Sequence, residues 1–152
     1  MYHLPCRTRE GKEQYKLGRL QLIGCGIGAR HTITVANVYG WTRGAEETHQ
    51  AMRTDHLLRA ALNELAGVPD TEPIILVGDL NADLHNLATV QQMLASGWTD
   101  LGTLYDASPT CYANEGSRGT RRDYALANAA ALTCTTDFRV VQGDILPLID
   151  PL

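Results

Sequence analysis

Two runs of alternating residues near the start of the chain predict a pair of β-strands. The first reads RLQLIGCGIG over residues 19–28, and the second reads HTITVANVYGW over residues 31–41. In the second run Thr32, Thr34, Ala36 and Val38 alternate with Ile33, Val35, Asn37 and Tyr39. β-Branched residues and two sides of different character are typical of a strand in a sheet. The short link Gly28-Ala29-Arg30 indicates a hairpin between them.

The hydrophobic period changes to that of a helix over residues 45–66, AEETHQAMRTDHLLRAALNELA. One stripe of this helix carries Met52, Leu58, Ala61, Leu62 and Leu65. Acidic residues open the first turn, where they suit the helix dipole, and Gly67 ends the helix.

The second half of the chain predicts a shorter helix and further strands. The helix runs from Leu87 to Ser96, and Gly97 suits a left-handed C-terminal cap. The turn-rich stretch SPTCYANEGSRG indicates a loop or hairpin. The predicted strands are Ile74–Val77, Asp123–Ala127 and Phe138–Val141.

The first eighteen residues, MYHLPCRTREGKEQYKLG, are polar and aperiodic. We interpret residues 1–18 as a poorly ordered lead-in or a remnant strand. Residues 19–152 form one α/β unit, with no internal repeat, linker or low-complexity stretch.

Composition indicates a soluble globular domain that works inside the cell. The chain has 152 residues, of which 44% are hydrophobic and 20% charged. No apolar run approaches the roughly 20 residues that span a bilayer, so no membrane partner is expected. The start lacks the apolar core of a secretory signal, which favours a nuclear or cytoplasmic protein. A net charge of -4 argues against a dedicated nucleic-acid binder, but not against an enzyme that acts on phosphates through a metal.

The four cysteines, Cys6, Cys25, Cys111 and Cys134, form no C-x-x-C pair and no zinc motif. We expect reduced thiols that are buried or half-buried.

An acid and an amide follow the predicted strand Ile74–Val77, in the order Gly78-Asp79-Leu80-Asn81. If extended geometry persists, Asp79 and Asn81 point to the same side at the C-terminal end of the strand, where α/β sheets usually bind ligands. A carboxylate can orient a water or take its proton, and an amide can donate to a phosphate oxygen. The alternative is a turn at Gly78-Asp79, with Asn81 capping the loop.

Four segments in a fixed order resemble a known superfamily. ITVANVYGWT, PIILVGDLNAD, ASGWTDL and TRRDYALAN together resemble the endonuclease/exonuclease/phosphatase superfamily, which includes exonuclease III-like enzymes and the endonuclease domains of non-LTR retroelements. The resemblance runs from about Leu20 to Leu148. It implies a two-sheet α/β sandwich that hydrolyses phosphate esters, of nucleic acid in many members, with Mg²⁺ or Mn²⁺.

The resemblance also implies roles for individual residues. Asp79 resembles the acid that orients or deprotonates the attacking water, and Asn81 resembles the amide that holds the scissile phosphate. Tyr39 resembles the active-site tyrosine. Asp123 resembles the acid that orients the catalytic histidine. Asp144 matches the family's second acid, near the metal.

Two departures from the family pattern lower the expected activity. No glutamate follows an apolar strand, so the family's metal-binding Glu has no counterpart among Glu10, Glu13, Glu46 and Glu47. Ile145 stands where the family has the catalytic histidine. Because Ile offers neither a donor nor a proton, its presence should lower the rate by about 100- to 1000-fold. We interpret the chain as a fold incomplete at its N-terminus, from a truncated or decayed copy of a longer gene of retroelement type.

Three hypotheses for function follow. The first is a divalent-metal phosphodiesterase, and the second is a non-catalytic domain that keeps the fold and binds nucleic acid or protein. The third is a dinucleotide-binding module, because Gly24, Gly26 and Ala29 fit the G-x-G-x-x-A spacing. A strand-like segment follows where that fingerprint needs a helix, so the third is the weakest.

Several site residues also have structural interpretations. Tyr39 could be an ordinary half-buried strand tyrosine, and Asp123 could pair with Arg121 or Arg118. Trp41 and Trp98 are expected to pack rather than to stack on bases. Arg118, Arg121 and Arg122 are expected to form a solvated rim.

Overall fold

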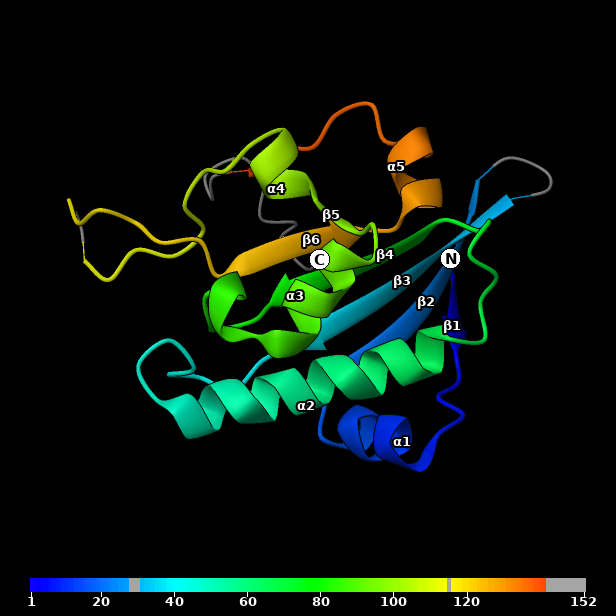
Figure 1. The fold of residues 1–152 in the computed structure, drawn as a ribbon, viewed down its shortest axis with the longest axis horizontal. Coiled ribbons are helices and arrows are strands. Elements are labelled where there is room, and N and C mark those ends of the chain that lie inside the picture. The colour runs from blue at the N-terminus through cyan, green and yellow to red at the C-terminus, as the bar shows by residue number, and fades with distance from the viewer. Residues whose placement is uncertain (28–30, 115, 142–152) are drawn as a thin grey trace, which may run out of the picture.

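The computed structural model describes residues 1–27, 31–114 and 116–141. Its strands form one mixed sheet with the order β1-β2-β3-β4-β6-β5 (Figure 1). The strands are β1 (Tyr2–Leu4), β2 (Leu20–Ile27), β3 (His31–Tyr39), β4 (Ile74–Asp79), β5 (Thr99–Asp100) and β6 (Asp123–Ala127). The helices are α1 (Arg9–Lys16), α2 (Thr48–Leu65), α3 (Ala88–Ala95), α4 (Leu101–Leu104) and α5 (Ala129–Cys134), with a 3₁₀ turn, η1 (Leu84–Asn86).

The sheet is antiparallel except at its centre, where β3 and β4 run parallel. A parallel pair needs a crossover connection, and α2 supplies it. β6 then returns antiparallel to β4. The C-terminal ends of β3 and β4 and the N-terminal end of β6 therefore lie at one edge of the sheet.

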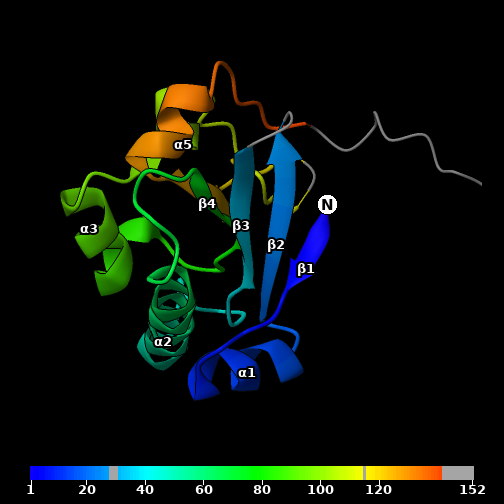
Figure 2. The same cartoon turned by 90° about the vertical axis from the view of Figure 1, so that its right-hand side faces the viewer.

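Helices α1, α2 and α3 lie together on one face of the sheet (Figure 2). The main core forms between these helices and the even-numbered positions of β3 and β4, including Ala36, Val38, Ile74 and Leu76. This alternation confirms the two-sided character that the sequence predicts for β3. On α2, Leu58, Ala61 and Leu65 are buried as predicted, but Met52 is 65% exposed because it lies on the outer side of the first turns.

A smaller cluster covers the opposite face near β6. Leu101 of α4 and Ala131 of α5 pack with Ala125 and Ala127, and Phe138 adds to the cluster. Phe138 belongs to a segment predicted as a strand, Phe138–Val141, and this prediction is wrong. The segment has irregular backbone because its amides bond to side chains: the Val140 N–H donates to the Asp106 carboxylate at 2.8 Å.

The sequence predicts a poorly ordered lead-in or a remnant strand for residues 1–18, and the structure has a short strand and a helix there. β1 extends the sheet beside β2, and α1 packs against α2. The Glu64 carboxylate of α2 accepts hydrogen bonds from the Arg7 N–H (2.7 Å), the Thr8 N–H (2.7 Å) and the Thr8 hydroxyl (2.6 Å). Because these contacts are polar, no hydrophobic period marks the segment.

The structure confirms some of the remaining sequence predictions and contradicts others. The short helix is α3, and Gly97 adopts a positive φ of 93°, as a left-handed cap requires. All four cysteines are free as predicted, but Cys111 and Cys134 are exposed rather than buried because they lie on a loop and at a helix end. The predicted hairpin link, residues 28–30, and the predicted site residues Asp144 and Ile145 lie outside the described residues. In the part of the chain that is described, no helix is both long and apolar enough to cross a membrane.

Candidate functional site

Three predicted site residues form one row across neighbouring strands. Tyr39 lies opposite Asp79 in the β3–β4 ladder, and Asp79 lies opposite Asp123 in the β4–β6 ladder. Residues that face each other across strands project from the same side of a sheet. The sheet therefore brings Tyr39, Asp79 and Asp123 together at the edge described above, and we call them the acid row.

Asn81 reaches this edge by a turn and not by strand alternation. β4 continues through Asp79, as the extended interpretation requires, but Asn81 has a left-handed backbone with φ 51°. Its N–H donates to the Asp79 carboxylate at 2.8 Å, and its side-chain amide donates to the Gly40 carbonyl at 3.3 Å. Asn tolerates this conformation better than most residues. The strand interpretation thus holds for Asp79, and the turn interpretation holds for Asn81.

Asp79 is held in a partly buried, electrostatically unfavourable position. Burial raises the pKa of the Asp79 carboxyl, and the negative charge of Asp123 raises it further. The hydrogen bonds from Asn81 and the positive charge of Arg122 act in the opposite direction without cancelling this effect. A carboxylate whose pKa is shifted toward neutrality is a better proton acceptor at physiological pH.

Asp123 is exposed at the start of β6, and a threonine fixes its backbone. The Thr110 hydroxyl accepts from the Asp123 N–H at 3.0 Å and from the Arg122 N–H at 2.9 Å. Arg121 pairs with Asp100, so the predicted alternative of an Asp123–Arg121 pair is wrong. Within the described ranges Asp123 forms no ion pair, which leaves its carboxylate available.

Tyr39 is 46% exposed, so about half of it is covered, and the alternative of an ordinary half-buried strand tyrosine stays open. Arg19 supports the end of its strand. One guanidinium nitrogen of Arg19 donates to the carbonyls of Tyr39 (3.2 Å) and Gly40 (2.8 Å). The same guanidinium lies 4.7 Å from the centre of the Tyr39 ring. The sequence analysis missed Arg19, because a lone arginine before a strand carries no recognisable pattern.

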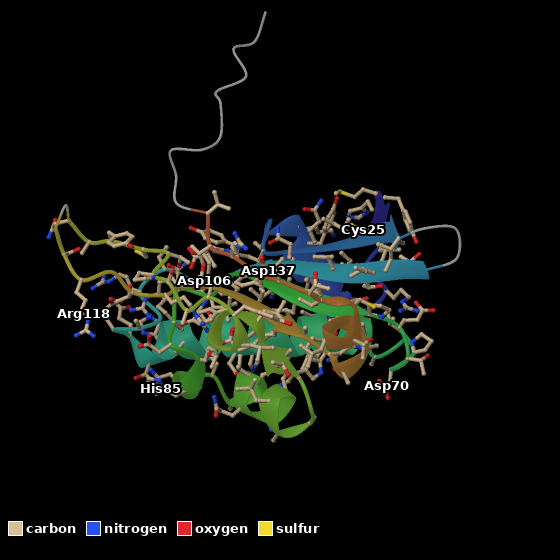
Figure 3. All side chains as sticks on the ribbon, turned by 90° about the horizontal axis from the view of Figure 1, so that it is seen from above. Cys25, Asp70, His85, Asp106, Arg118 and Asp137 are labelled. Carbon is tan, nitrogen blue, oxygen red and sulfur yellow. The ribbon has the colours of Figure 1, made fainter. Side chains whose placement is uncertain are left out.

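The three arginines predicted to form a solvated rim do not share one environment. Arg121 and Arg122 are only 15% and 17% exposed and pair with Asp100 and Asp83, the latter at 2.6 Å. Arg118 alone lies out on the exposed loop (Figure 3). Trp41 and Trp98 both pack against the main core, as predicted.

The strands at this edge approach each other more closely than side chains would allow. A Cβ on Gly78 would overlap the carbonyl oxygen of Val38, and one on Gly40 would overlap the carbonyl oxygen of Leu80. Gly78 also has a φ of 148°. The glycine before Asp79 is therefore needed for the packing that places the acid row.

The acid row supplies some, but not all, of the ligands that a divalent metal needs. Carboxylate oxygens are the ligands that Mg²⁺ prefers, and one or two of them suffice when substrate and water complete the shell. Asp79 and Asp123 supply two, and a cation beside them would offset their repulsion. No cluster of three His, Cys, Asp or Glu side chains suited to a metal occurs among the described residues.

The four glutamates considered in the sequence analysis and two of the histidines lie on other elements of the described structure. Glu10 and Glu13 lie on α1, while Glu46 and Glu47 precede α2. His49 pairs with Glu47 at 3.4 Å, and His85 lies on η1 at the periphery (Figure 3).

No protein-family model and no curated protein matches the sequence. Solved structures do match the fold. Humanized D. rerio TDP2 carrying 14 mutations is 18% identical with a TM-score of 0.57, over 73% of this chain and 45% of that one. D. rerio TDP2 complexed with a single-strand DNA product is 16% identical with a TM-score of 0.54, over 74% and 47%. An endonuclease/exonuclease/phosphatase protein from Beutenbergia cavernae DSM 12333 is 20% identical with a TM-score of 0.55, over 85% and 37%.

These matches confirm the predicted α/β fold. The chain has the fold of endonuclease/exonuclease/phosphatase proteins, and it spans less than half the length of each of these three structures. The region between β2 and β3 also argues against the dinucleotide-binding hypothesis. β2 ends at Ile27 and β3 begins at His31, which leaves no room for the helix that this fingerprint needs.

Proposed function

We propose that this chain, with its endonuclease/exonuclease/phosphatase fold, binds a phosphate ester at the acid row and hydrolyses it slowly. The observation that carries the proposal is the alignment of Tyr39, Asp79 and Asp123 across three strands at one edge. The single-strand DNA product held by D. rerio TDP2 supports nucleic acid as the substrate. Other phosphate esters fit the same chemistry.

Each residue has a role that its contacts support. Asp79, fixed by the Asn81 N–H, orients the attacking water and accepts its proton. The Asn81 side-chain amide donates to the Gly40 carbonyl and lies beside the Asp79 carboxylate, where it could donate to a bound phosphate oxygen. The exposed Tyr39 hydroxyl can donate to the same phosphate.

A divalent cation would be held by Asp79 and Asp123, and the family pattern adds Asp144, which lies outside the described residues. When bound, Mg²⁺ or Mn²⁺ would neutralise charge that develops on the phosphate and the leaving oxygen. Ile145 supplies no donor, so we expect a rate about 100- to 1000-fold below that of a site with the histidine.

The test is nicking of supercoiled plasmid by the purified chain with Mg²⁺ or Mn²⁺. We expect slow, chelator-sensitive nicking that Asp79→Asn lowers by about 100-fold or more. Asp70→Asn is the matched control, because Asp70 is an exposed acid far from the acid row (Figure 3). Ile145→His should raise the rate by about 100-fold. Nicking that persists in Asp79→Asn would contradict the proposal.

A non-catalytic domain of the same fold is the second candidate. Ile145 and the presence of only two acids in the row favour it. Under this alternative, folded protein would bind phosphate esters but show no Asp79-dependent cleavage, and Ile145→His would not create any.

A further inference from the structure

Four neighbouring side chains on β2 and β3 form a partly exposed apolar surface, which we call the open patch. They are Ile23 and Cys25 of β2 and Ile33 and Val35 of β3. Ile23 lies opposite Val35, and Cys25 lies opposite Ile33, so all four project from the same side of the sheet. Within the described part of the chain, neither of the two core clusters includes any of them.

The open patch faces away from the main core. The alternate residues of the same two strands, including Leu22 and Ala36, pack against helices α1, α2 and α3 (Figure 2). Successive side chains of a strand point to opposite faces, so the patch lies on the face that these helices do not cover.

The patch continues a surface that is already used for packing. Val35 lies opposite Ile75 of β4, and Ile75 lies opposite Ala127 of β6. Ile75 and Ala127 belong to the smaller cluster, which α4 and α5 help to form. One apolar row therefore crosses four strands from Ile23 to Ala127, with its β6 end packed under helices and its β2 end in the open patch. Apolar side chains gathered in this way favour association.

The charge of the patch favours a second copy of this chain as the occupant. The four side chains are uncharged, and so are Gln21 and Asn37, which lie opposite each other next along the same face. The chain as a whole has a net charge of -4, so two copies approaching through charged surfaces would repel each other. Contact through this patch sets no like charges against one another, and it offers a strongly charged partner no complementary charge.

The shape of this face is compatible with pairing to itself. Helices α4 and α5 rise above the part of the sheet that β6 forms, while the part formed by β2 and β3 is lower (Figure 1). A twofold rotation about an axis along the strands sets the lower part of one copy against the lower part of the other. The raised helices of each copy then lie beside the β1 edge of its partner, so they do not obstruct the contact.

We infer that the open patch is the contact surface of a homodimer in which two sheets pack face to face. The inference goes beyond the proposed function and does not depend on it. Twofold dimers are the commonest oligomers, and they use the same surface on both copies. Packed sheets interdigitate the side chains of their inner faces, and β-branched side chains such as Ile23, Ile33 and Val35 suit this arrangement.

The size of the patch sets the strength of the dimer. β2 has 8 residues, so it is about 26 Å long, and the three strands β2, β3 and β4 span about 14 Å. Contact over this surface covers roughly 400 Å² of each copy, or roughly 800 Å² in total, which is the size of a weak, transient interface. We therefore expect a reversible dimer with a Kd on the order of 10 µM.

Sedimentation velocity of the full chain tests the inference, from about 1 µM to about 500 µM, a range that brackets the expected Kd. The wild type should pass from monomer to dimer and no further. Val35→Lys should weaken the dimer by about 100-fold or more, because each dimer would bury two unpaired lysines. Met52→Lys is the matched control and should leave the Kd unchanged, because Met52 is a 65% exposed apolar residue on α2, away from the patch. Urea unfolding establishes that both variants are folded.

Cysteine labelling gives a second measurement that leaves the patch intact. In a Cys111→Ser, Cys134→Ser background, iodoacetamide reports on Cys25, because Cys6 is buried. With a Kd on the order of 10 µM, mass action leaves about a tenth of the chains monomeric at about 500 µM, so Cys25 should react about 10-fold more slowly there than at about 1 µM. A protein that keeps Cys111 but carries Cys25→Ser is the control, and its labelling rate should not depend on concentration.

The other occupants of the face predict different results, and each would overturn the inference. A monomer whose Cys25 reacts equally at every concentration would mean that no second copy binds. A monomer whose Cys25 is protected at every concentration would assign the cover to another segment of the same chain. A dimer that Val35→Lys leaves intact would place the contact elsewhere, and growth beyond the dimer would indicate non-specific association.

Discussion

Asp79 lies at the centre of the acid row, and its environment disfavours the ionised carboxylate that the proposed function requires. It lies opposite Asp123, partly buried, and neither acid is neutralised by an ion pair within the described residues. Neighbouring carboxylates repel each other, and burial disfavours the ionised form. Such a position is unfavourable for folding and useful for binding a cation or accepting a proton.

We expect Asp79→Asn to stabilise the protein at neutral pH. The folded pKa of Asp79 is raised, so ionisation above the ordinary pKa lowers stability, and that loss is absent at low pH, where the acid is protonated in both states. Asn keeps an oxygen to accept from the Asn81 N–H. Thermal unfolding in chelator should show a gain of up to about 1 kcal/mol at pH 7 and none near pH 3.

The control for this prediction is Asp70→Asn, which should change the unfolding temperature at neither pH. A fall in stability at pH 7 in Asp79→Asn would mean that the ionised carboxylate is a net stabilising group.

At the residue scale the sequence indicates candidate site residues but not how they meet. Tyr39, Asp79 and Asp123 could be chosen from motifs, and the strand register explains why they converge. The left-handed turn at Asn81 could not be foreseen, because Asn suits both an extended site and a turn. Arg19 and Thr110 act mainly through backbone groups, which leave no pattern in the sequence.

At the scale of elements, β4 governs the site because it pairs with both β3 and β6. Gly78 lets it approach Val38 of β3 at the residue before Asp79. The hydrophobic run Ile74–Val77 predicts the strand well, since a buried central strand is apolar along its length. The Phe138–Val141 run was misjudged, because β-branched residues also occur in irregular segments that side chains tether.

We expect Gly78→Ala to destabilise the fold by about 3 kcal/mol or more, because its methyl group would overlap a backbone carbonyl that cannot move aside. Gly26→Ala on β2 is the matched control, since a Cβ there meets no atom within 4 Å. Urea unfolding measures both. Equal, small effects in the two variants would show that β3 and β4 can separate without loss.

At the scale of the whole molecule, the first eighteen residues belong to the folded unit. Glu64 is only 2% exposed and joins α2 to the segment between β1 and α1. Burial by itself raises its pKa, but the hydrogen bonds from Arg7 and Thr8 prevail and lower it. The polar sequence of this segment concealed it, because Leu4 and Cys6 make its few contacts with the main core and the buried Glu64 carboxylate adds polar ones.

We expect Glu64→Gln to lower stability by about 2 kcal/mol at pH 7, because an amide offers one acceptor oxygen to three donors. A lowered pKa means that the stabilisation is present above the ordinary pKa of Glu and is lost as pH falls through the folded value. The difference between Glu64→Gln and wild type should therefore shrink below about pH 4.

Urea unfolding across pH tests this prediction, with the exposed Glu10→Gln on α1 as control. A difference that stays constant from pH 7 to pH 3 would assign the loss to packing and not to the charge of Glu64.

The arrangement of the acid row has a consequence for folding kinetics. β2 and β3 are close in sequence and can pair early, whereas Tyr39, Asp79 and Asp123 lie on strands joined by long connections. Contacts between distant parts of a chain form slowly, because the connecting loop must first be closed. We therefore expect the row to be assembled only when β6 docks on β4, late in folding. A ligand specific for the row would bind only molecules that have completed folding. The rate at which its binding signal appears would therefore report the rate of the last folding step.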